Sequence, residues 1–487
     1  MRTHDRSSPT DAHLDAMRRV ADPHADQAIT AILGSCPSAP VECLADSAAA
    51  AACGAAAAGR LRCVDKLNGV VRGWRDNADV ATWRADGAQL PPGMAAALEE
   101  YLKAARALPD WAEPQRIERA QRMFMDHGVL SVTALLCASL PECYVVPDVA
   151  EVVHATGQLE HRCDYRIRAT GAMLFPVMMV GGLTPHAPDG AGIAQILKVR
   201  LIHAMIRNLI LRGPPDEART VPPLAHIRQS DTMGPALHAL GWDVGTRGIP
   251  ANQEELAYTL LTFNYVFLRA MKRLDIPFSG EECRDYLHAW NVAGHFLGVR
   301  RELMAGTLTE AAALFARFQA RGRARWARHP GAVDPRPALG AALMGSLEDT
   351  FPGRTAKAFP VLITRRLVSR ACVKDLRLDG RAPWWPRLVF AVGGAVVRVV
   401  DAVGRRVASR QFSLARLVTR AIGYRLTCRL LMDETRPLAV SATLRPRIVS
   451  VIRGWGRDHQ ASPRMNALED RFTTDGEWEA LQPPGQQ

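Results

Sequence analysis

Apolar side chains recur at helical spacing along most of this chain. From about residue 94 to residue 323 they return every three or four positions, which is the spacing of one face of an α-helix. The strict alternation of apolar and polar residues that marks a half-buried strand is nearly absent. The pattern therefore predicts an all-α protein, with helices over residues 11–33, 94–108, 116–126, 131–139, 149–156, 165–180, 193–211, 253–274, 280–298 and 308–323.

Proline, glycine and capping residues divide this pattern into parts. Asn252 precedes a periodic segment and Glu255 follows it by three positions, the arrangement of a helix N-cap and its capping-box partner. The alanine-rich stretch 48–58 has low complexity and predicts a poorly packed helix or loop. We expect an N-terminal helix plus the alanine-rich stretch (1–90), a large helical body (91–350), and a basic helical C-terminal part packed on the core, with a polar tail after about residue 460 (351–487).

Composition and motifs exclude several classes of protein. The 487 residues are 48% hydrophobic and 23% charged, which is ordinary globular usage. The N-terminus has no apolar signal-peptide core, so we expect a cytoplasmic protein. The ten cysteines contain no CxxC pair, which argues against a zinc ribbon, a thioredoxin-type site or covalent c-type haem; we expect most of them to be small core residues. GxSxG, Walker A, GxGxxG and HExxH signatures are all absent.

The positive charge is concentrated near the C-terminus. Residues 351–460 contain 22 Arg or Lys and 6 Asp or Glu, an excess of 16 that is larger than the whole-chain net charge of +12. Within this region Trp384 and Trp385 lead into the apolar run 388–400, which is shorter than the about 20 residues that span a bilayer. Peripheral contact with a membrane and a basic outer face around a buried helix both fit this segment. No nucleic-acid recognition motif accompanies the charge, so we expect no nucleic-acid partner.

The strongest single candidate for chemistry is His203. No carboxylate lies within one helical turn of it, and it belongs to one apolar stripe at helical spacing, together with Ile196, Val199, Ile206 and Ile210. A buried imidazole either hydrogen-bonds a neighbour or ligates a metal, because an unpaired buried polar group is costly. The residues alone favour a core histidine with a hydrogen-bonded ring.

Two other polar pairs stand at helical spacing. Arg166 and Thr170 share a helix face one turn apart, a pair that by itself is most often a solvated face. His288 and His295 lie two turns apart, whereas ligands of a single metal on one helix are normally one turn apart. We therefore interpret the two histidines as packing residues or as residues that support a ligand.

Several segments together resemble one protein family. They occur in the family's order and approximate spacing: Ser139-Leu-Pro-Glu-Cys-Tyr144, Thr156-Gly157, Arg166 with Thr170, Lys198-Val-Arg-Leu-Ile-His-Ala-Met-Ile-Arg207, Gly248-Ile-Pro-Ala-Asn-Gln-Glu254 and Tyr286-Leu-His-Ala-Trp290. The chain resembles the rubber oxygenase (latex clearing protein) and MpaB-like family, whose members are helical, bind b-type haem and cleave isoprenoid double bonds with O2. The resemblance is good from about residue 120 to 310 and fainter at Ala21-Asp-Pro-His-Ala-Asp26 and through the C-terminal helices.

The resemblance implies a fold and a set of roles. It implies a large globin-like helical bundle around a haem pocket, with residues 91–350 as the haem-binding oxygenase domain and additional N- and C-terminal helices. His203 takes the position of the proximal ligand of the haem iron. Arg166 and Thr170 take positions near the haem with catalytic or cofactor-binding roles, and Arg207 takes the position of a further cofactor-binding residue. We expect the pocket to be lined by residues such as Phe175, Met178, Met179 and Phe263.

Two departures from the family pattern bear on the mechanism. Rubber-cleaving members have a lysine before the threonine that can occupy the distal iron site, and here that residue is Ala169, so the resemblance implies an open or water-filled sixth position. Those members also have a catalytic glutamate upstream of the arginine, and Glu151 lies nearest that offset. We expect a lipophilic substrate, an isoprenoid or other apolar alkene, and O2. A haem carrier or sensor without oxygenase activity, a membrane-associated helical protein without haem, and a different metal at the helical pocket remain alternatives, and the oligomeric state is not determined.

Overall fold

The computed structural model describes residues 9–34, 47–85, 90–155, 163–187, 190–224, 233–276, 278–328, 333–351, 356–380, 384–407, 414, 416–420, 463 and 467. The regular elements in these residues are helices, and the β-type pairing within them is one isolated bridge between Val221 and Trp242. The prediction of an all-α protein is therefore confirmed.

The described α-helices follow the predicted segments closely through the middle of the chain. In chain order they are α1 (Asp11–Met17), α2 (Pro23–Gly34), α3 (Ser47–Arg72), α4 (Asn77–Thr82), α5 (Pro92–Ala105), α6 (Pro114–Asp126), α7 (Gly128–Ala134), α8 (Leu140–Cys143), α9 (Pro147–Ala155), α11 (Cys163–Met178), α12 (Gly192–Leu211), α13 (Met233–Ala239), α14 (Val244–Arg247), α15 (Gln253–Phe263), α16 (Tyr265–Arg273), α17 (Gly280–Phe296), α18 (Leu308–Trp326), α19 (Arg336–Glu348), α20 (Phe359–Leu367), α21 (Arg370–Asp375) and α22 (Trp384–Val407). A π-helical turn, Leu135–Ser139, joins α7 to α8.

Two predicted segments differ from the structure for local reasons. The segment 11–33 is two helices, because α2 begins anew at Pro23, a residue suited to the first turn of a helix. The segment 253–274 breaks at Asn264, whose side chain accepts a hydrogen bond from the backbone N–H of the next residue. The stretch 48–58, expected as a poorly packed helix or loop, has helical backbone within α3.

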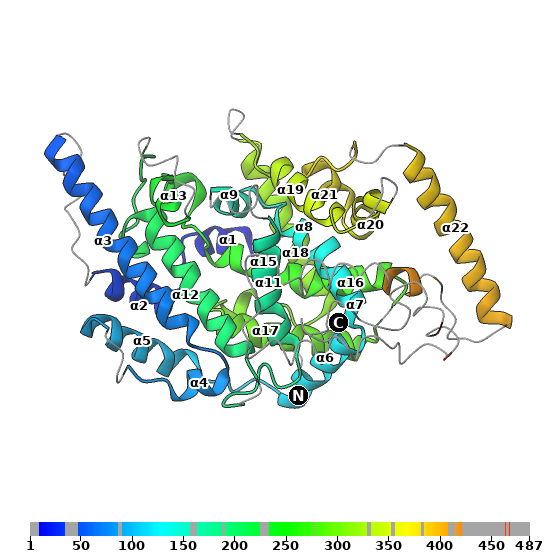
Figure 1. Cartoon of the computed structure of the whole chain (residues 1–487), viewed down its shortest axis with the longest axis horizontal. Helices are drawn as coiled ribbons and strands as arrows, with labels where there is room; N and C mark the ends of the chain where they lie inside the picture. Colours follow the sequence, from blue (N-terminus) through cyan, green and yellow to red (C-terminus); the bar gives the residue numbers. More distant parts are fainter. Residues whose placement is uncertain are drawn as a thin grey trace, which may run out of the picture.

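The helix that contains His203, α12, is surrounded by other described helices. Around α12 pack α2, α4, α11, α13 and α17, while α3 and α22 stand at opposite ends (Figure 1). Four thiols lie in the core, as expected for small core residues: those of Cys137, Cys143, Cys283 and Cys372. Cys63, in contrast, is disulfide-bonded.

No single described helix is long and apolar enough to cross a membrane. One bent pair, Pro114–Asp126 with Gly128–Cys143, reaches the required length and composition, with an angle of 91° between its halves.

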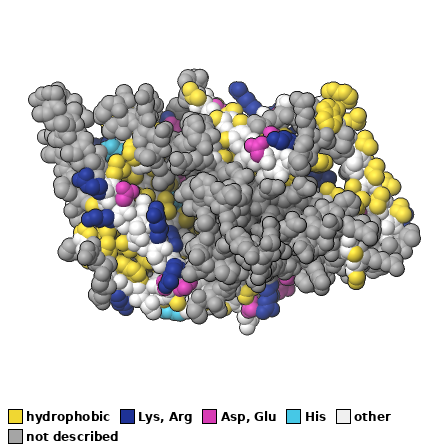
Figure 2. All heavy atoms as spheres, in the orientation of Figure 1, with side chains coloured by type: hydrophobic (Ala, Val, Ile, Leu, Met, Phe, Trp, Pro, Cys, Tyr) yellow, Lys and Arg dark blue, Asp and Glu magenta, His cyan; other side chains and the backbone are white. Residues whose placement is uncertain are grey.

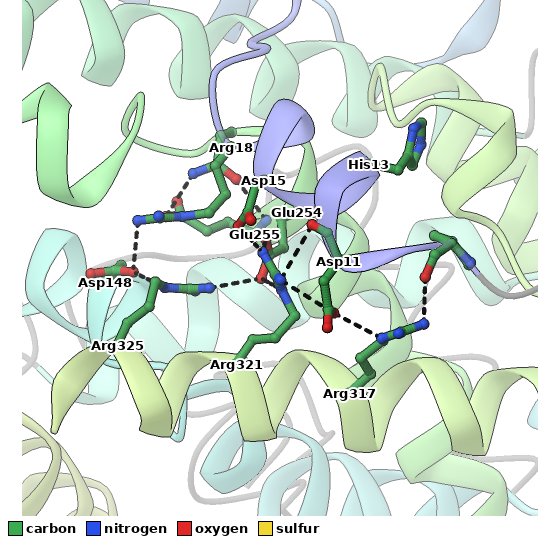
Figure 3. Close-up of polar contacts among 12 residues, drawn as sticks. Asp11, His13, Asp15, Arg18, Asp148, Glu254, Glu255, Arg317, Arg321 and Arg325 are labelled. Atoms are coloured by element: carbon green, nitrogen blue, oxygen red, sulfur yellow. Dashed lines mark hydrogen bonds and ion pairs between the residues drawn. The ribbon is translucent and has the colours of Figure 1, made fainter. Parts of the chain in front are cut away.

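A cluster of charged side chains joins the N-terminus of the chain to the helical body (Figure 3). Arg321 of α18 pairs with Asp15 of α1 (2.5 Å) and with Glu254 of α15 (3.2 Å). Arg325, one turn further along α18, reaches Glu254 at 3.0 Å and Asp148 of α9 at 3.3 Å. Four helices that are distant in sequence are thus held together by arginine–carboxylate pairs, which have the strong bonding geometry of charged hydrogen bonds.

Glu255, next to Glu254 in this region, is also buried. The predicted N-cap is confirmed: Asn252 accepts a hydrogen bond from the backbone N–H of Glu255 (3.1 Å), and the Asn252 amide donates to the Glu255 carboxylate (2.9 Å). Burial, helped by the Asp148 carboxylate, raises the pKa of Glu255 to about 8, against the opposing effect of Arg18 and Arg325. The folded protein therefore keeps a proton on this carboxyl group at pH values where an unfolded chain has released it.

We expect the Glu255→Gln variant to flatten the pH dependence of stability. In the native chain the free energy of unfolding falls as pH rises from the ordinary glutamate pKa of 4.5 to about 8, because only the unfolded state loses the proton in this window. The variant loses this slope, roughly 1 kcal/mol per pH unit at its steepest. Denaturant unfolding at several pH values measures it. The control is Glu302→Gln, at a half-exposed ion pair with Arg300; an equal flattening there contradicts the prediction.

Candidate functional site

His203 lies half-buried in the second half of α12. Of the apolar residues that share its stripe, Ile196 and Ile210 are buried, while Val199 and Ile206 are half-buried. The apolar setting predicted for the imidazole is therefore present on this helix.

Two buried ion pairs fasten α12 to α2 on either side of His203. Arg200 donates two hydrogen bonds to Asp22, at 2.5 and 2.7 Å. Arg207 donates to Asp26 at 2.8 Å and to the carbonyl oxygen of Ala251 at 2.8 Å. The two carboxylates are themselves joined, because the Asp22 backbone N–H donates to Asp26 at 2.9 Å. We call these four charged residues the Asp–Arg ladder.

Because the Asp–Arg ladder is buried, its charged partners must stay within hydrogen-bond distance of each other. Arg207 has no exposed surface, and Asp22 and Asp26 are 3% and 6% exposed. Burial raises the pKa of Asp26, while the guanidinium of Arg207 lowers it. A buried charge that loses its partner is strongly destabilising, so both pairs hold the backbone of α12 at a fixed position relative to α2.

Two glycines allow backbone to approach this arrangement closely. A Cβ at Gly298 would lie 2.4 Å from a carboxylate oxygen of Asp22, and its φ of +85° is in the left-handed region that favours glycine. A Cβ at Gly192, the first residue of α12, would lie 2.6 Å from the carbonyl oxygen of Gly182. The start of α12 can therefore pack directly against the segment that follows α11.

The other half of the candidate site is α11, which contains Arg166, Ala169 and Thr170. The Arg166 side chain lies outside the described residues, whereas Thr170 lines an apolar pocket of about 290 Å³ including its mouth. The remaining lining comes from α11, α7, α8 and the π-helical turn: Val132, Leu135, Leu136, Leu140, Ile167, Gly171, Leu174 and Phe175. Most of that space is open to solvent: the closed part is about 20 Å³, room for about one water-sized group, whereas ligand pockets hold about 300 to 1,000 Å³.

The structure separates some residues that the sequence placed together. Of the four expected pocket residues, Phe175 lines this pocket; Met178, Met179 and Phe263 are buried in the core. Glu151, on α9, pairs with Arg247 of α14 at 2.5 Å and is half-buried. A role for Glu151 as a base stays a prediction.

The two histidines of α17 pack around an indole ring, in agreement with the interpretation of them as packing residues. His288 and His295 both meet Trp111 edge-on, with ring centroids 5.8 and 6.2 Å apart. The ring Nε2 of His288 also accepts a hydrogen bond from the backbone N–H of Glu113 (2.9 Å). Burial lowers the pKa of His288 to about 4, so this ring is neutral near pH 7.

The available donor atoms fit a haem better than a metal held by the protein alone. Within the described parts of the chain, no group of three or more His, Cys, Asp or Glu could hold a metal ion. A porphyrin supplies four ligands of its own, so the single imidazole of His203 would suffice as the protein ligand of a haem. In addition, the Nη2 atom of Arg207 is buried and has no hydrogen-bond partner in the described structure. This N–H group, one turn from His203, suits a carboxylate such as a haem propionate.

Sequence reasoning missed several residues that build the site. Asp22 and Asp26 belong to the faintly matching Asp-Pro-His-Ala-Asp segment, and their spacing of one turn was the available signal for two partners on one face. Glu142, in the segment Ser139–Tyr144, is fully buried and binds Arg269 (2.5 Å), Gln319 (2.7 Å) and the Ser369 backbone N–H (3.0 Å). No local pattern identifies a carboxylate whose partners come from three separate segments.

Comparisons with known proteins agree with the helical architecture. The family model described as "ER-bound oxygenase mpaB/B'/Rubber oxygenase, catalytic domain" matches residues 121–399. A rubber oxygenase of Streptomyces sp. (strain K30) is 25% identical over 233 residues, which cover 47% of this chain and 50% of that protein. The chain thus matches about half the length of this curated relative. A solved structure of latex clearing protein in the closed state aligns over 90% of both chains with a TM-score of 0.54 and 17% identity, a likeness in fold.

We expect the Asp26→Ala variant to destabilise the protein strongly, because it leaves the buried guanidinium of Arg207 without its charge partner. The free energy of unfolding should fall by roughly 3 kcal/mol or more. The matched control is Glu302→Ala at the half-exposed pair with Arg300, which should change stability by about 0.5 kcal/mol at most. Denaturant unfolding followed by circular dichroism measures both, and equal effects would contradict a dominant role for the Asp–Arg ladder.

Proposed function

This chain belongs to the family of mpaB/B′ and rubber oxygenase catalytic domains, and on that premise we propose that it is a haem-dependent oxygenase acting on an isoprenoid or another apolar alkene. The observation that carries the proposal is the pairing of two features on adjacent helices. A half-buried imidazole on α12 is held in place by the Asp–Arg ladder, and α11 beside it presents a threonine to an apolar pocket.

The residues that would hold the haem lie on both helices. His203 would be the axial ligand, and the unpaired N–H group of Arg207 together with Arg166 would bind the propionates. A bound haem supplies the activation of O2 that no amino-acid side chain can perform. The protein's own part is to fix the imidazole, because α12 cannot shift along α2 without separating two buried charge pairs.

The apolar pocket would contact part of the substrate. All of its lining side chains are hydrocarbon except that of Thr170, so it favours an alkene chain and excludes water. Ala169, the residue before Thr170, has no side-chain atom that can bind iron. It would therefore leave the oxygen-binding side of a haem open. Because such alkenes collect in membranes, the proposal includes contact with a membrane face.

The first test is spectroscopic and needs no known substrate. Full-length protein produced with adequate haem should show a Soret band that shifts on reduction with dithionite, and the His203→Ala variant should lose most of the bound haem because its axial bond is gone. The control is His238→Ala on α13, a half-buried histidine on a helix that packs against α12, which should keep its haem. Protein without a Soret band, or His203→Ala with native haem content, would overturn the assignment. Uptake of O2 with a prenyl alkene under reducing conditions then tests the oxygenase activity.

The role of Glu151 is tested by comparing it with its ion-pair partner. If the carboxylate acts as a base, Glu151→Gln should lower kcat by roughly a hundredfold or more with an unchanged haem spectrum. Arg247→Gln breaks the same ion pair but leaves the carboxylate, so it should retain most of the activity. Equal losses of kcat in the two variants would assign Glu151 to a structural pair instead. Steady-state O2 consumption measures both.

A further inference from the structure

The outer face of α22 is a continuous apolar surface without a covering element among the described residues. Trp384, at its start, is 75% exposed, and Val399, in its second half, is 63% exposed. The remaining exposed large apolar residues of the helix are Trp385, Leu388, Val392, Val396, Val400 and Val403. We call these eight residues the α22 stripe.

The α22 stripe follows a helical period and faces away from the protein. Apart from the adjacent pairs 384/385 and 399/400, its members recur at intervals of three or four residues, so they form one face of the helix. A helix of this kind normally turns its apolar face to the core, whereas α22 turns another face inward: Asp401 is 4% exposed, and contacts to the body are made with α20. Figure 1 shows α22 standing at one end of the molecule, and Figure 2 shows apolar side chains along that edge.

The charge of the sequence that contains α22 indicates what covers the α22 stripe. The helix itself contains four arginines, at 387, 398, 405 and 406, and one aspartate, at 401. The region 351–460 has an excess of 16 positive charges. Two copies of the chain would bring two positively charged helices together, which their charge opposes. An anionic phospholipid surface offers both an apolar layer for the stripe and negative headgroups for the arginines.

We propose that α22 docks the protein on the surface of an anionic phospholipid bilayer, with the α22 stripe inserted at the boundary between headgroups and acyl chains. Trp384 and Trp385 begin the helix, and indole rings favour this boundary because they combine an apolar body with a polar N–H group. The helix lies along the surface, because its apolar residues occupy one face while Asp401 on another face is turned inward. The inference deepens the proposed function, because it names the surface from which the protein would take a substrate dissolved in the membrane. Only this link to the substrate rests on the proposed function.

The test is vesicle sedimentation with the full-length protein. Wild type should bind phosphatidylcholine vesicles containing phosphatidylglycerol about tenfold more tightly than pure phosphatidylcholine vesicles, and added salt should weaken the binding. Replacing two stripe residues, Val396→Asp with Val399→Asp, should lower vesicle binding by about tenfold or more. The matched control is Val333→Asp, at an exposed valine outside α22 that is 89% exposed, which should bind as wild type does.

Several outcomes would overturn the proposal. The first is wild-type protein that does not bind the anionic vesicles. The second is an equal loss of binding in the stripe variant and in Val333→Asp. The third is wild-type protein that binds no vesicles but forms a dimer, with the dimer dissociated by the two stripe substitutions. The haem spectrum of the same samples separates the two proposals. Wild-type protein with a native haem spectrum that binds no anionic vesicles overturns docking alone, and wild-type protein that binds the vesicles but contains no haem overturns the oxygenase alone.

Discussion

The candidate site depends on two buried charge pairs between α2 and α12. Each carboxylate of Asp22 and Asp26 has been removed from water, and each is compensated by one guanidinium at hydrogen-bond distance. Such a pair contributes little net stability compared with apolar packing, but its separation is costly. Its effect is therefore geometric. It fixes the register of α12 against α2, and with it the position of the imidazole of His203.

The rest of the interior uses the same device at other junctions. Glu142 collects bonds from Arg269, Gln319 and the backbone of Ser369, and Glu254 joins Arg321 to Arg325. Helices that meet through apolar side chains alone can slide or rotate at small cost, whereas directional bonds to a buried carboxylate allow one arrangement. The π-helical turn leads directly into α8, which contains Glu142, and Gly298 lies against the carboxylate of Asp22. The result is a rigid frame around a small apolar pocket on α11.

The interior helices and the outer helix α22 differ in the kind of partner that their side chains suit. The frame holds an imidazole and an apolar pocket on adjacent helices, α12 and α11, which are suited to a flat apolar cofactor and an apolar substrate. At the end of the molecule, α22 carries the apolar surface and positive charge that suit a lipid interface. The proposed reaction centre therefore depends on buried charge pairs, and the proposed docking surface on exposed apolar side chains.

The sequence by itself determined the helical class, most helix positions in the middle of the chain, the Asn252 cap and the apolar stripe around His203. These features depend on residues within one or two turns of each other, so a local period or spacing contains them. Only the tertiary structure decided that Asp22 meets Arg200, 178 residues away, and that Asp26 meets Arg207, 181 residues away. It also decided that the apolar face of α22 points outward, although its pattern alone equally fits a buried helix. The physical reason is that periodicity states which face of a helix is apolar, while the packing of distant segments chooses what that face meets.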